Sequence, residues 1–200
     1  MTDVLGATPE GIQRAAELLR AGEVVAFPTD TVYGVGVALS RRERLEDLFA
    51  LKARPADRRI PILVSDLTQA IAAGWEADER AHRLTQRFWP GALTLVLAGT
   101  VETQAFRAPD HPVALELIRG SGPILTTSAN RSGEPETMGA DDVLIAFALE
   151  QEGLAAVLDG GTVPGGVAST VLDVSVTPAR ILRSGPVTRE QLAEIVELAP

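Results

Sequence analysis

Pro28-Thr-Asp-Thr-Val-Tyr-Gly34 directly follows the apolar run Val24-Val-Ala-Phe27, and this junction is the best single indication of the fold. The apolar run has the length and composition of a buried strand, which Pro28 ends. In open α/β sheets, ligands bind beyond the carboxyl ends of strands. A turn needs only one Asx or Ser/Thr cap, whereas 28–34 holds three hydroxyl groups, a carboxylate and an aromatic ring. We therefore interpret 28–34 as a candidate binding segment.

Strand-like runs alternate with helical patterns along the rest of the chain. Thr8 and Pro9 are typical of a helix start, and Gly22 ends the helical spacing that follows them. Thr188 with Gln191 has the spacing of a capping box. Further helices are predicted from Leu45 to before Arg54, at 66–73, 78–88 and 141–149, and after Pro112; further strands are predicted at 60–64, 93–97, up to Arg107, at 124–127, 155–158, 168–174 and 180–183. This mixture predicts an α/β (α+β) fold, with a single domain over residues 1–200.

Composition excludes several classes of function. The 18 basic and 27 acidic residues give a net charge of −9, which excludes a generally basic nucleic-acid coat protein. The absence of cysteine excludes thiol nucleophiles, zinc–thiolate sites and iron–sulfur clusters, and two histidines cannot form a multi-histidine metal site. The sequence has neither a signal-peptide pattern nor an apolar run of about 18 residues. We therefore expect a cytoplasmic protein that does not associate with membranes.

Further polar clusters stand beside predicted strands or helix ends. Lys52 is the one lysine among 18 basic residues, which favours a site that needs a compact positive charge over a chance survivor of an arginine-rich composition. Pro55 disfavours helical geometry at Arg54, so both cations can turn into one pocket; a helix end decorated with cations that suit its dipole is the alternative. The other clusters are Arg107–Pro112, Thr126–Gly133, Gly165–Val171 and Ile181–Gly185. The sequence has no P-loop and no dinucleotide fingerprint, so any nucleotide is held by other means.

In this order the motifs resemble those of the threonylcarbamoyl-AMP synthase family, which has a YrdC-like fold. They are Pro-Thr-Asp-Thr-Val-Tyr-Gly (28–34), Lys-x-Arg-Pro (52–55), Trp-Pro-Gly-x-Leu-Thr-Leu-Val (89–96), Arg-x-Pro-x-His-Pro (107–112), Ser-Ala-Asn-x-Ser-Gly (128–133), Gly-x-x-Ser-Thr-Val (166–171) and Leu-Arg-x-Gly (182–185). The resemblance extends over about residues 10–195 and matches the short, single-domain form. It implies a twisted mixed β-sheet with flanking helices around a central, positively charged cavity.

The resemblance also implies a reaction. The family condenses L-threonine, bicarbonate (as carbon dioxide) and ATP to threonylcarbamoyl-AMP and pyrophosphate. Mg²⁺ accompanies ATP, and we expect no metal site formed by the protein itself. In such a pathway a tRNA-modifying transferase complex passes the threonylcarbamoyl group to tRNA, and weak tRNA binding by this chain is a related expectation.

Individual residues receive roles from the same resemblance. Lys52 and Arg54 are the expected catalytic residues. The threonine site is expected to contain Thr29, Arg107, Thr126 and Ser169, and the ATP site Lys52, Arg54, Ala56, Ser128, Asn130, Glu136 and Arg183. Ser65 stands where many relatives have a histidine. Because carboxylates facing phosphate groups weaken ATP binding, we expect Glu134 and Glu136 to point outward.

Two other interpretations remain. The first is a double-stranded RNA or tRNA-binding module without turnover, which could use the basic residues of 41–60. The second is carbamoyl transfer from carbamoyl phosphate, as in related domains of hydrogenase maturation proteins. Those proteins are much longer and carry zinc-finger cysteines, which this sequence lacks.

Overall fold

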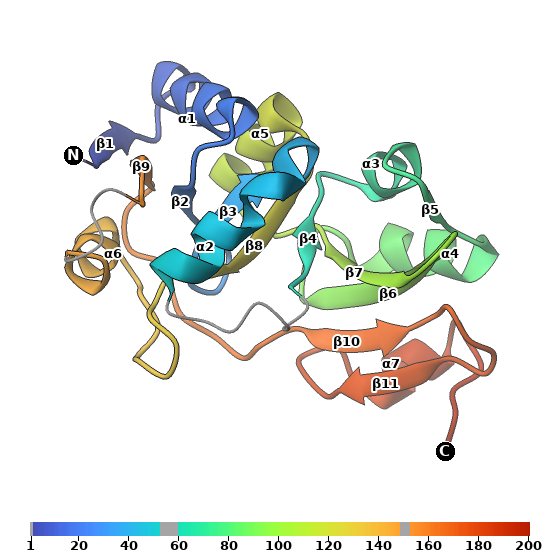
Figure 1. Cartoon of the computed structure of the whole chain (residues 1–200). Coiled ribbons are helices and arrows are strands. Elements are labelled where there is room, and N and C mark those ends of the chain that lie inside the picture. Colours follow the sequence, from blue (N-terminus) through green and yellow to red (C-terminus); the bar gives the residue numbers. More distant parts are fainter. Residues whose placement is uncertain (1, 53–59, 149–152) are drawn as a thin grey trace.

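The structure is a computed structural model that describes residues 2–52, 60–148 and 153–200. Within these ranges eleven strands form one mixed sheet in the order β1-β9-β2-β3-β8-β4-β7-β6-β10-β11, with β5 paired to β6 (Figure 1). The strands are β1 (Asp3–Gly6), β2 (Val25–Pro28), β3 (Tyr33–Ala38), β4 (Ile62–Leu63), β5 (Trp75–Glu76), β6 (Leu93–Gly99), β7 (Thr103–Arg107), β8 (Ile124–Ser128), β9 (Ala156–Asp159), β10 (Thr170–Asp173) and β11 (Arg180–Arg183). The helices are α1 (Pro9–Ala21), α2 (Leu45–Leu51), α3 (Leu67–Ala72), α4 (Glu79–Phe88), α5 (Pro112–Ser121), α6 (Ala140–Ala146) and α7 (Arg189–Ala193), with a 3-10 helix η1 (Leu39–Arg44) before α2. Over the described residues, no helix is both long and apolar enough to span a membrane.

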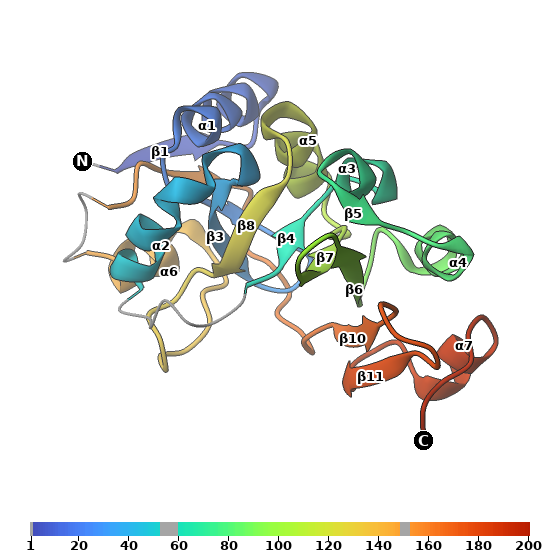
Figure 2. The same ribbon diagram turned by 45° about the vertical axis from the view of Figure 1, so that its right-hand side comes forward.

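The centre of the sheet is buried on both faces. Val25 and Phe27 of β2 join a hydrophobic cluster with α1 and α5, whereas Ala26 joins a second cluster on the opposite face, to which α2 contributes. Both views show α1 beside α5 (Figures 1 and 2). A strand covered on both faces needs apolar side chains at every position rather than at alternate ones. This explains why 24–27 is apolar throughout.

The predicted ends of two helices are confirmed by their capping contacts. The Thr8 hydroxyl accepts a hydrogen bond from Gly11 N at 3.2 Å at the start of α1. Gly22 ends α1 with φ 96°, a left-handed conformation that glycine adopts without a steric cost. Thr188 and Gln191 form the predicted capping box at the start of α7.

The structure adds a strand that was not predicted. Tyr33, at the end of the candidate binding segment 28–34, begins β3 and pairs with Pro28 of β2. The glycines of β3 weaken its strand propensity, but they are required by packing: a Cβ on Gly36 would lie 2.4 Å from the Leu125 carbonyl oxygen of the neighbouring β8. The short strands β1 and β5 were also not predicted, since they are defined by pairing with β9 and β6, which are distant in sequence.

The polar clusters meet because the strands that carry them end close together. β2 ends at Pro28, β7 ends at Arg107 and β8 ends at Ser128. Strand β4 pairs with both β7 and β8, and β6 pairs with both β7 and β10. These pairings bring the ends of strands that are up to about 140 residues apart in sequence to one edge of a common cavity.

Candidate active site

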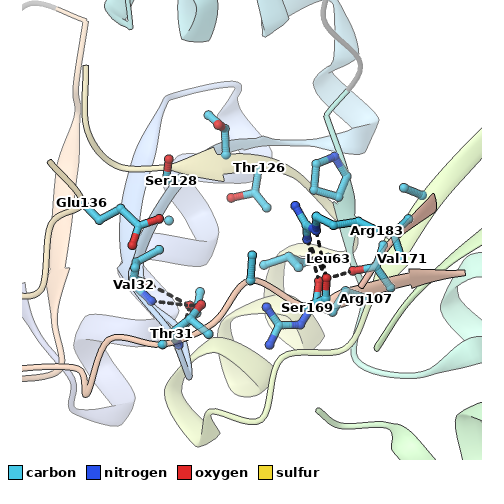
Figure 3. A pocket seen from close by; sticks show the side chains of 18 residues that line it. Thr31, Val32, Leu63, Arg107, Thr126, Ser128, Glu136, Ser169, Val171 and Arg183 are labelled. Carbon is cyan, nitrogen blue, oxygen red and sulfur yellow. Dashed lines mark hydrogen bonds between the residues drawn. The ribbon is translucent and has the colours of Figure 1, made fainter. Parts of the chain in front are cut away.

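A cavity of about 260 Å³ opens among these strand ends (Figure 3). Pockets for drug-sized ligands have volumes of about 300–1,000 Å³, so this cavity suits a small metabolite or one end of a larger ligand. Most of the predicted site residues that the structure describes line it: Thr29, Arg107, Thr126, Ser128, Glu136, Ser169 and Arg183. Leu63 and Val171 contribute apolar wall.

Thr29 both lines the cavity and holds the turn after β2. Its hydroxyl donates to Val32 O at 2.6 Å and accepts from the backbone N–H groups of Thr31 and Val32, each at 3.3 Å. The turn is therefore capped by a threonine side chain, and the same turn presents Asp30 toward Arg107. The capping and binding interpretations of 28–34 are compatible in one structure.

Arg107 is the most constrained cation of the cavity. Its Nε donates to Gly91 O at 2.9 Å, and its Nη2 forms an ion pair with Asp30 Oδ2. The Arg107 and Asp30 side chains are only 12% and 18% exposed. Burial lowers the pKa of the Arg107 guanidinium from its ordinary value, and the negative charge of Asp30 opposes that shift. Arginine nevertheless stays protonated in proteins, so Arg107 provides a fixed positive charge at the cavity wall.

Arg183 and two hydroxyl groups form a second polar group of the cavity. Arg183 donates from Nε and Nη2 to Ser169 O at 3.0 and 2.8 Å, and from Nη2 to Ser169 Oγ at 3.2 Å (Figure 3). Ser169 Oγ also lies 2.7 Å from Thr94 Oγ1 in a buried contact. This network joins β6, β11 and the residue before β10 at one wall.

Lys52 and Asn130 lie close to the cavity, but they are not among the described residues that line it. Lys52 is 2% exposed, and its Nζ donates to the backbone oxygen of Ser128. Asn130 donates from Nδ2 to Glu134 O at 2.6 Å, and its buried Oδ1 has no hydrogen-bond partner among the described residues. The structure thus brings Lys52 next to Ser128 of the Ser-Ala-Asn motif. Arg54 and Ala56 lie outside the described residues.

The expectation that both glutamates point outward is wrong for Glu136. Glu136 lines the cavity, and Figure 3 shows its carboxylate on the side of Ser128, away from Arg107. Its position follows from its neighbour: Tyr33 N donates to Thr137 O at 2.9 Å, and Thr137 Oγ1 donates to Ala129 O at 3.2 Å. These bonds hold the chain against the start of β3. Glu134 is exposed.

Two residues of the site received no role from the sequence. Asp30 was recognised only as one polar residue of a cluster, and its pairing with Arg107 joins positions 77 residues apart. Thr94 lines the cavity and contacts Ser169. In the sequence, Thr94 was recognised only as the threonine of the Trp-Pro-Gly-x-Leu-Thr-Leu-Val motif (89–96), without a role of its own. Such a residue is buried only where it finds a hydrogen-bond partner.

The arrangement is suited to binding a small, negatively charged metabolite. Two guanidinium groups can each bind a carboxylate or phosphate through paired N–H groups, and hydroxyl groups and apolar side chains fill the remaining wall. Among the described residues, no group of three or more His, Cys, Asp or Glu side chains could hold a metal ion. The fold and site therefore define an α/β protein with a cavity at strand ends whose lining is suited to an anion.

Comparison with known proteins gives the family. Residues 17–185 match the Sua5/YciO/YrdC family model, described as telomere recombination, and the chain belongs to this family. The threonylcarbamoyl-AMP synthase of Bacillus subtilis is 40% identical over 98% of this chain and 59% of its own length. The threonylcarbamoyl-AMP synthase of Pyrococcus abyssi is 38% identical over 92% of this chain and 57% of its own length. The crystal structure of Pyrococcus abyssi Sua5 complexed with L-threonine superposes with a TM-score of 0.87 at 34% identity, covering 100% of this chain and 63% of that one.

These findings confirm the resemblance and the YrdC-like mixed α/β fold that it implied. The chain spans less than two thirds of the length of these relatives. That residues 1–200 form a single domain stays a prediction.

Proposed function

We propose that this chain is an L-threonylcarbamoyladenylate synthase, a nucleotidyltransferase that condenses L-threonine, bicarbonate and ATP. The observation that carries the proposal is the cavity itself: Arg107 and Arg183 flank hydroxyl groups of three separate strand ends. The structural relative with L-threonine bound has the same fold over the whole of this chain. The volume of about 260 Å³ accommodates an amino acid and leaves a nucleotide to extend beyond it.

The threonine carboxylate is assigned to Arg107, the most buried cation of the cavity. Thr29, Thr126 and Ser169 line the same cavity and are the proposed partners of the remaining polar groups of threonine. An apolar wall that includes Leu63 and Val171 is available to the threonine methyl group. A carboxylate on a buried guanidinium gains strength from the low local dielectric.

ATP is assigned to the side of the cavity that carries Ser128 and Glu136, together with Arg183. Lys52 and Asn130 support this side from just behind Ser128, and Arg54 and Ala56 complete the proposed nucleotide site in the segment that follows Lys52. Lys52 and Arg54 remain the proposed catalytic residues. Glu136 is unusual there, because a carboxylate repels phosphate; it suits a position facing the ribose or a phosphate-bound cation.

The chemistry requires several positive charges at one place. Bicarbonate loses hydroxide to give carbon dioxide, which the neutral amine of threonine attacks. The proton that the amine then loses converts the hydroxide to water, and a carbamate remains. A carbamate oxygen then attacks the α-phosphorus of ATP, and the bond to the departing pyrophosphate breaks. Because an anion approaches an anion, fixed cations lower the barrier by offsetting repulsion and the charge on the leaving group.

Mg²⁺ is proposed to arrive with ATP and to neutralise charge on its phosphates. The donor set of the protein agrees with this: Glu136 is the one carboxylate residue among the described residues lining the cavity. One carboxylate with phosphate oxygens and water is a common way to hold Mg²⁺.

The deciding experiment is pyrophosphate release from ATP with and without L-threonine and bicarbonate. We expect release that needs both substrates, with AMP appearing as the product decays. Release that needs neither would contradict the proposal. A folded protein that releases none, and binds tRNA in a salt-dependent way, would favour the RNA-binding alternative.

Lys52→Ala tests the nucleotide site. We expect loss of ATP-dependent pyrophosphate release, because a buried ammonium group next to Ser128 is removed. Lys52→Met fills the buried volume and separates loss of charge from loss of packing, and thermal unfolding of both variants checks the fold. Turnover near that of the wild type in Lys52→Met would contradict the assignment.

The remaining partners follow from the proposed product. A threonylcarbamoyl adenylate is a mixed anhydride, so a transferase complex is proposed to pass its acyl group to tRNA in the cytoplasm. The chain itself is proposed to bind tRNA weakly at most, since its net charge is −9 and the basic residues of the cavity wall face a small volume.

A further inference from the structure

Asp30 is a half-buried carboxylate at the threonine end of the cavity, and the proposed chemistry does not use it. Its Oδ2 pairs with Arg107 Nη2. Its Oδ1 is buried and has no hydrogen-bond partner among the described residues. Asp30 is also not among the described residues that line the cavity. Because Asp30 does not reach the cavity, it acts on a ligand through Arg107.

The ion pair determines which edge of the guanidinium remains available. Arg107 Nε is occupied by Gly91 O, and Nη2 donates to Asp30. No hydrogen bond from Nη1 is present within the described ranges. The two contacts fix the plane of the guanidinium, and the outer Nη1 side is left for a ligand in the cavity that Arg107 lines. A guanidinium held at two points loses little conformational entropy when it binds a carboxylate.

Asp30 also changes the charge of this end of the cavity. Arg107 and Arg183 are close enough for the charge of one to act on the other. Asp30 balances one of the two positive charges, while Asp110 has the smallest effect on Arg107 and is exposed. His111 is the other titratable group beside Asp30, and its burial favours the neutral form. When no nucleotide is bound, one unbalanced positive charge remains, that of Arg183, which is bonded to Ser169 of the proposed threonine site. This single charge complements a ligand group with a single negative charge.

We propose that Asp30 is a positioning residue that holds Arg107 and restricts the threonine end of the cavity to monoanionic groups. This inference rests on the proposed function in one respect, since the monoanion is taken to be the α-carboxylate of L-threonine. A dianion is disfavoured because its desolvation cost is about four times that of a monoanion, whereas its attraction to the one net positive charge left by Asp30 only doubles.

The test uses two probes that have similar tetrahedral shapes but differ in charge, methanesulfonate and sulfate. Their ability to displace L-threonine is measured by calorimetry in the absence of ATP. In the wild type we expect methanesulfonate to displace threonine at lower concentration than sulfate. Sulfate that competes as well as methanesulfonate in the wild type overturns the proposal, and this arm needs no variant.

Asp30→Asn provides the second arm. We expect sulfate to become about tenfold more effective relative to methanesulfonate, and the KM for L-threonine to rise about tenfold, with kcat and the KM for ATP within about twofold of the wild type. Asp110→Asn removes a nearby exposed charge, and we expect it to leave all these values unchanged. An unchanged probe preference in Asp30→Asn, or an equal rise in both KM values, overturns the proposal.

Failure of the proposed function gives a different result. A wild-type protein that binds L-threonine but releases no pyrophosphate would refute the synthase assignment and leave the Asp30 displacement experiment intact. A synthase whose probe preference is the same with and without the Asp30 charge would refute only the role of Asp30.

Discussion

The two guanidinium groups of the cavity are held in opposite ways. Arg107, on β7, is 12% exposed and is paired with the half-buried carboxylate of Asp30. Arg183, on β11, is exposed and donates to neutral oxygen atoms of Ser169. A buried charge needs an opposite charge to offset its desolvation, whereas an exposed charge keeps its hydration. We therefore expect Arg107 to contribute more than Arg183 to the stability of the fold. Arg183 can exchange its hydrogen bonds to Ser169 for bonds to a ligand at a smaller cost in stability.

Arg107→Ala is expected to have the largest effect, because it leaves the half-buried carboxylate of Asp30 without its partner. We expect the free energy of unfolding to fall by about 3 kcal/mol and kcat/KM for L-threonine to fall at least about 100-fold. Urea denaturation and pyrophosphate release measure the two effects. Arg119→Ala, an exposed arginine of α5, is the control. If Arg107→Ala is as stable as the wild type, the pairing of Arg107 with Asp30 does not stabilise the fold.

Arg183→Ala tests whether the exposed arginine affects ligand binding more than it affects stability. Because Arg183 is exposed and bonded to neutral groups, we expect the free energy of unfolding to change by less than about 1 kcal/mol, while kcat/KM for ATP falls about tenfold or more. Arg183→Lys keeps the positive charge but loses the paired N–H groups of the guanidinium, so it separates the contribution of charge from that of paired hydrogen bonding. A loss of stability as large as that of Arg107→Ala would remove the distinction between the two arginines.

Thr94→Val tests the contact between β6 and the group formed by Ser169 and Arg183. Thr94 lies on β6, and its hydroxyl contacts Ser169, to which Arg183 is bonded. We expect a stability loss of about 1 kcal/mol and a rise of a few fold in the KM for L-threonine. Thr100→Val, at an exposed position, is the matched control for the measurement by chemical denaturation and steady-state kinetics. If Thr94→Val has the stability and the KM for L-threonine of the wild type, the contact of Thr94 with Ser169 contributes to neither.

The pH dependence contributed by His111 is expected to be the smallest effect. Burial lowers the pKa of His111 below its usual 6.5, although Asp30 and Asp110 act in the opposite direction. The unfolded chain therefore binds the proton more readily, so this contribution to stability is present above about pH 6.5 and is lost as the pH falls toward the lower folded pKa. Unfolding by urea between pH 7.5 and pH 5.5 measures it. We expect His111→Gln to flatten this dependence and His82→Gln, at an exposed position, to leave it unchanged.

Local chemistry made the helices and the buried strand β2 predictable. Thr8 with Gly22, and Thr188 with Gln191, act on the residues next to them, so the sequence alone gives those boundaries. β3 was missed because its glycines have low strand propensity, and the close approach of β8 that requires Gly36 is a tertiary contact. The short strands β1 and β5 were missed for the same reason, since only pairing with remote strands defines them.

The sequence by itself determined which chemical groups the site contains. The order and spacing of the polar clusters gave the family, and the hydroxyl groups of Thr126 and Ser169 and the cations Arg107 and Arg183 were all predicted at the cavity that they line. Tertiary structure alone decided how those groups are arranged. The pairing of Arg107 with Asp30 and the contact of Thr94 with Ser169 join residues that the sheet brings together, and the fold places Glu136 at the cavity. Side-chain charge is a property of one residue, whereas burial and pairing are properties of the packed chain.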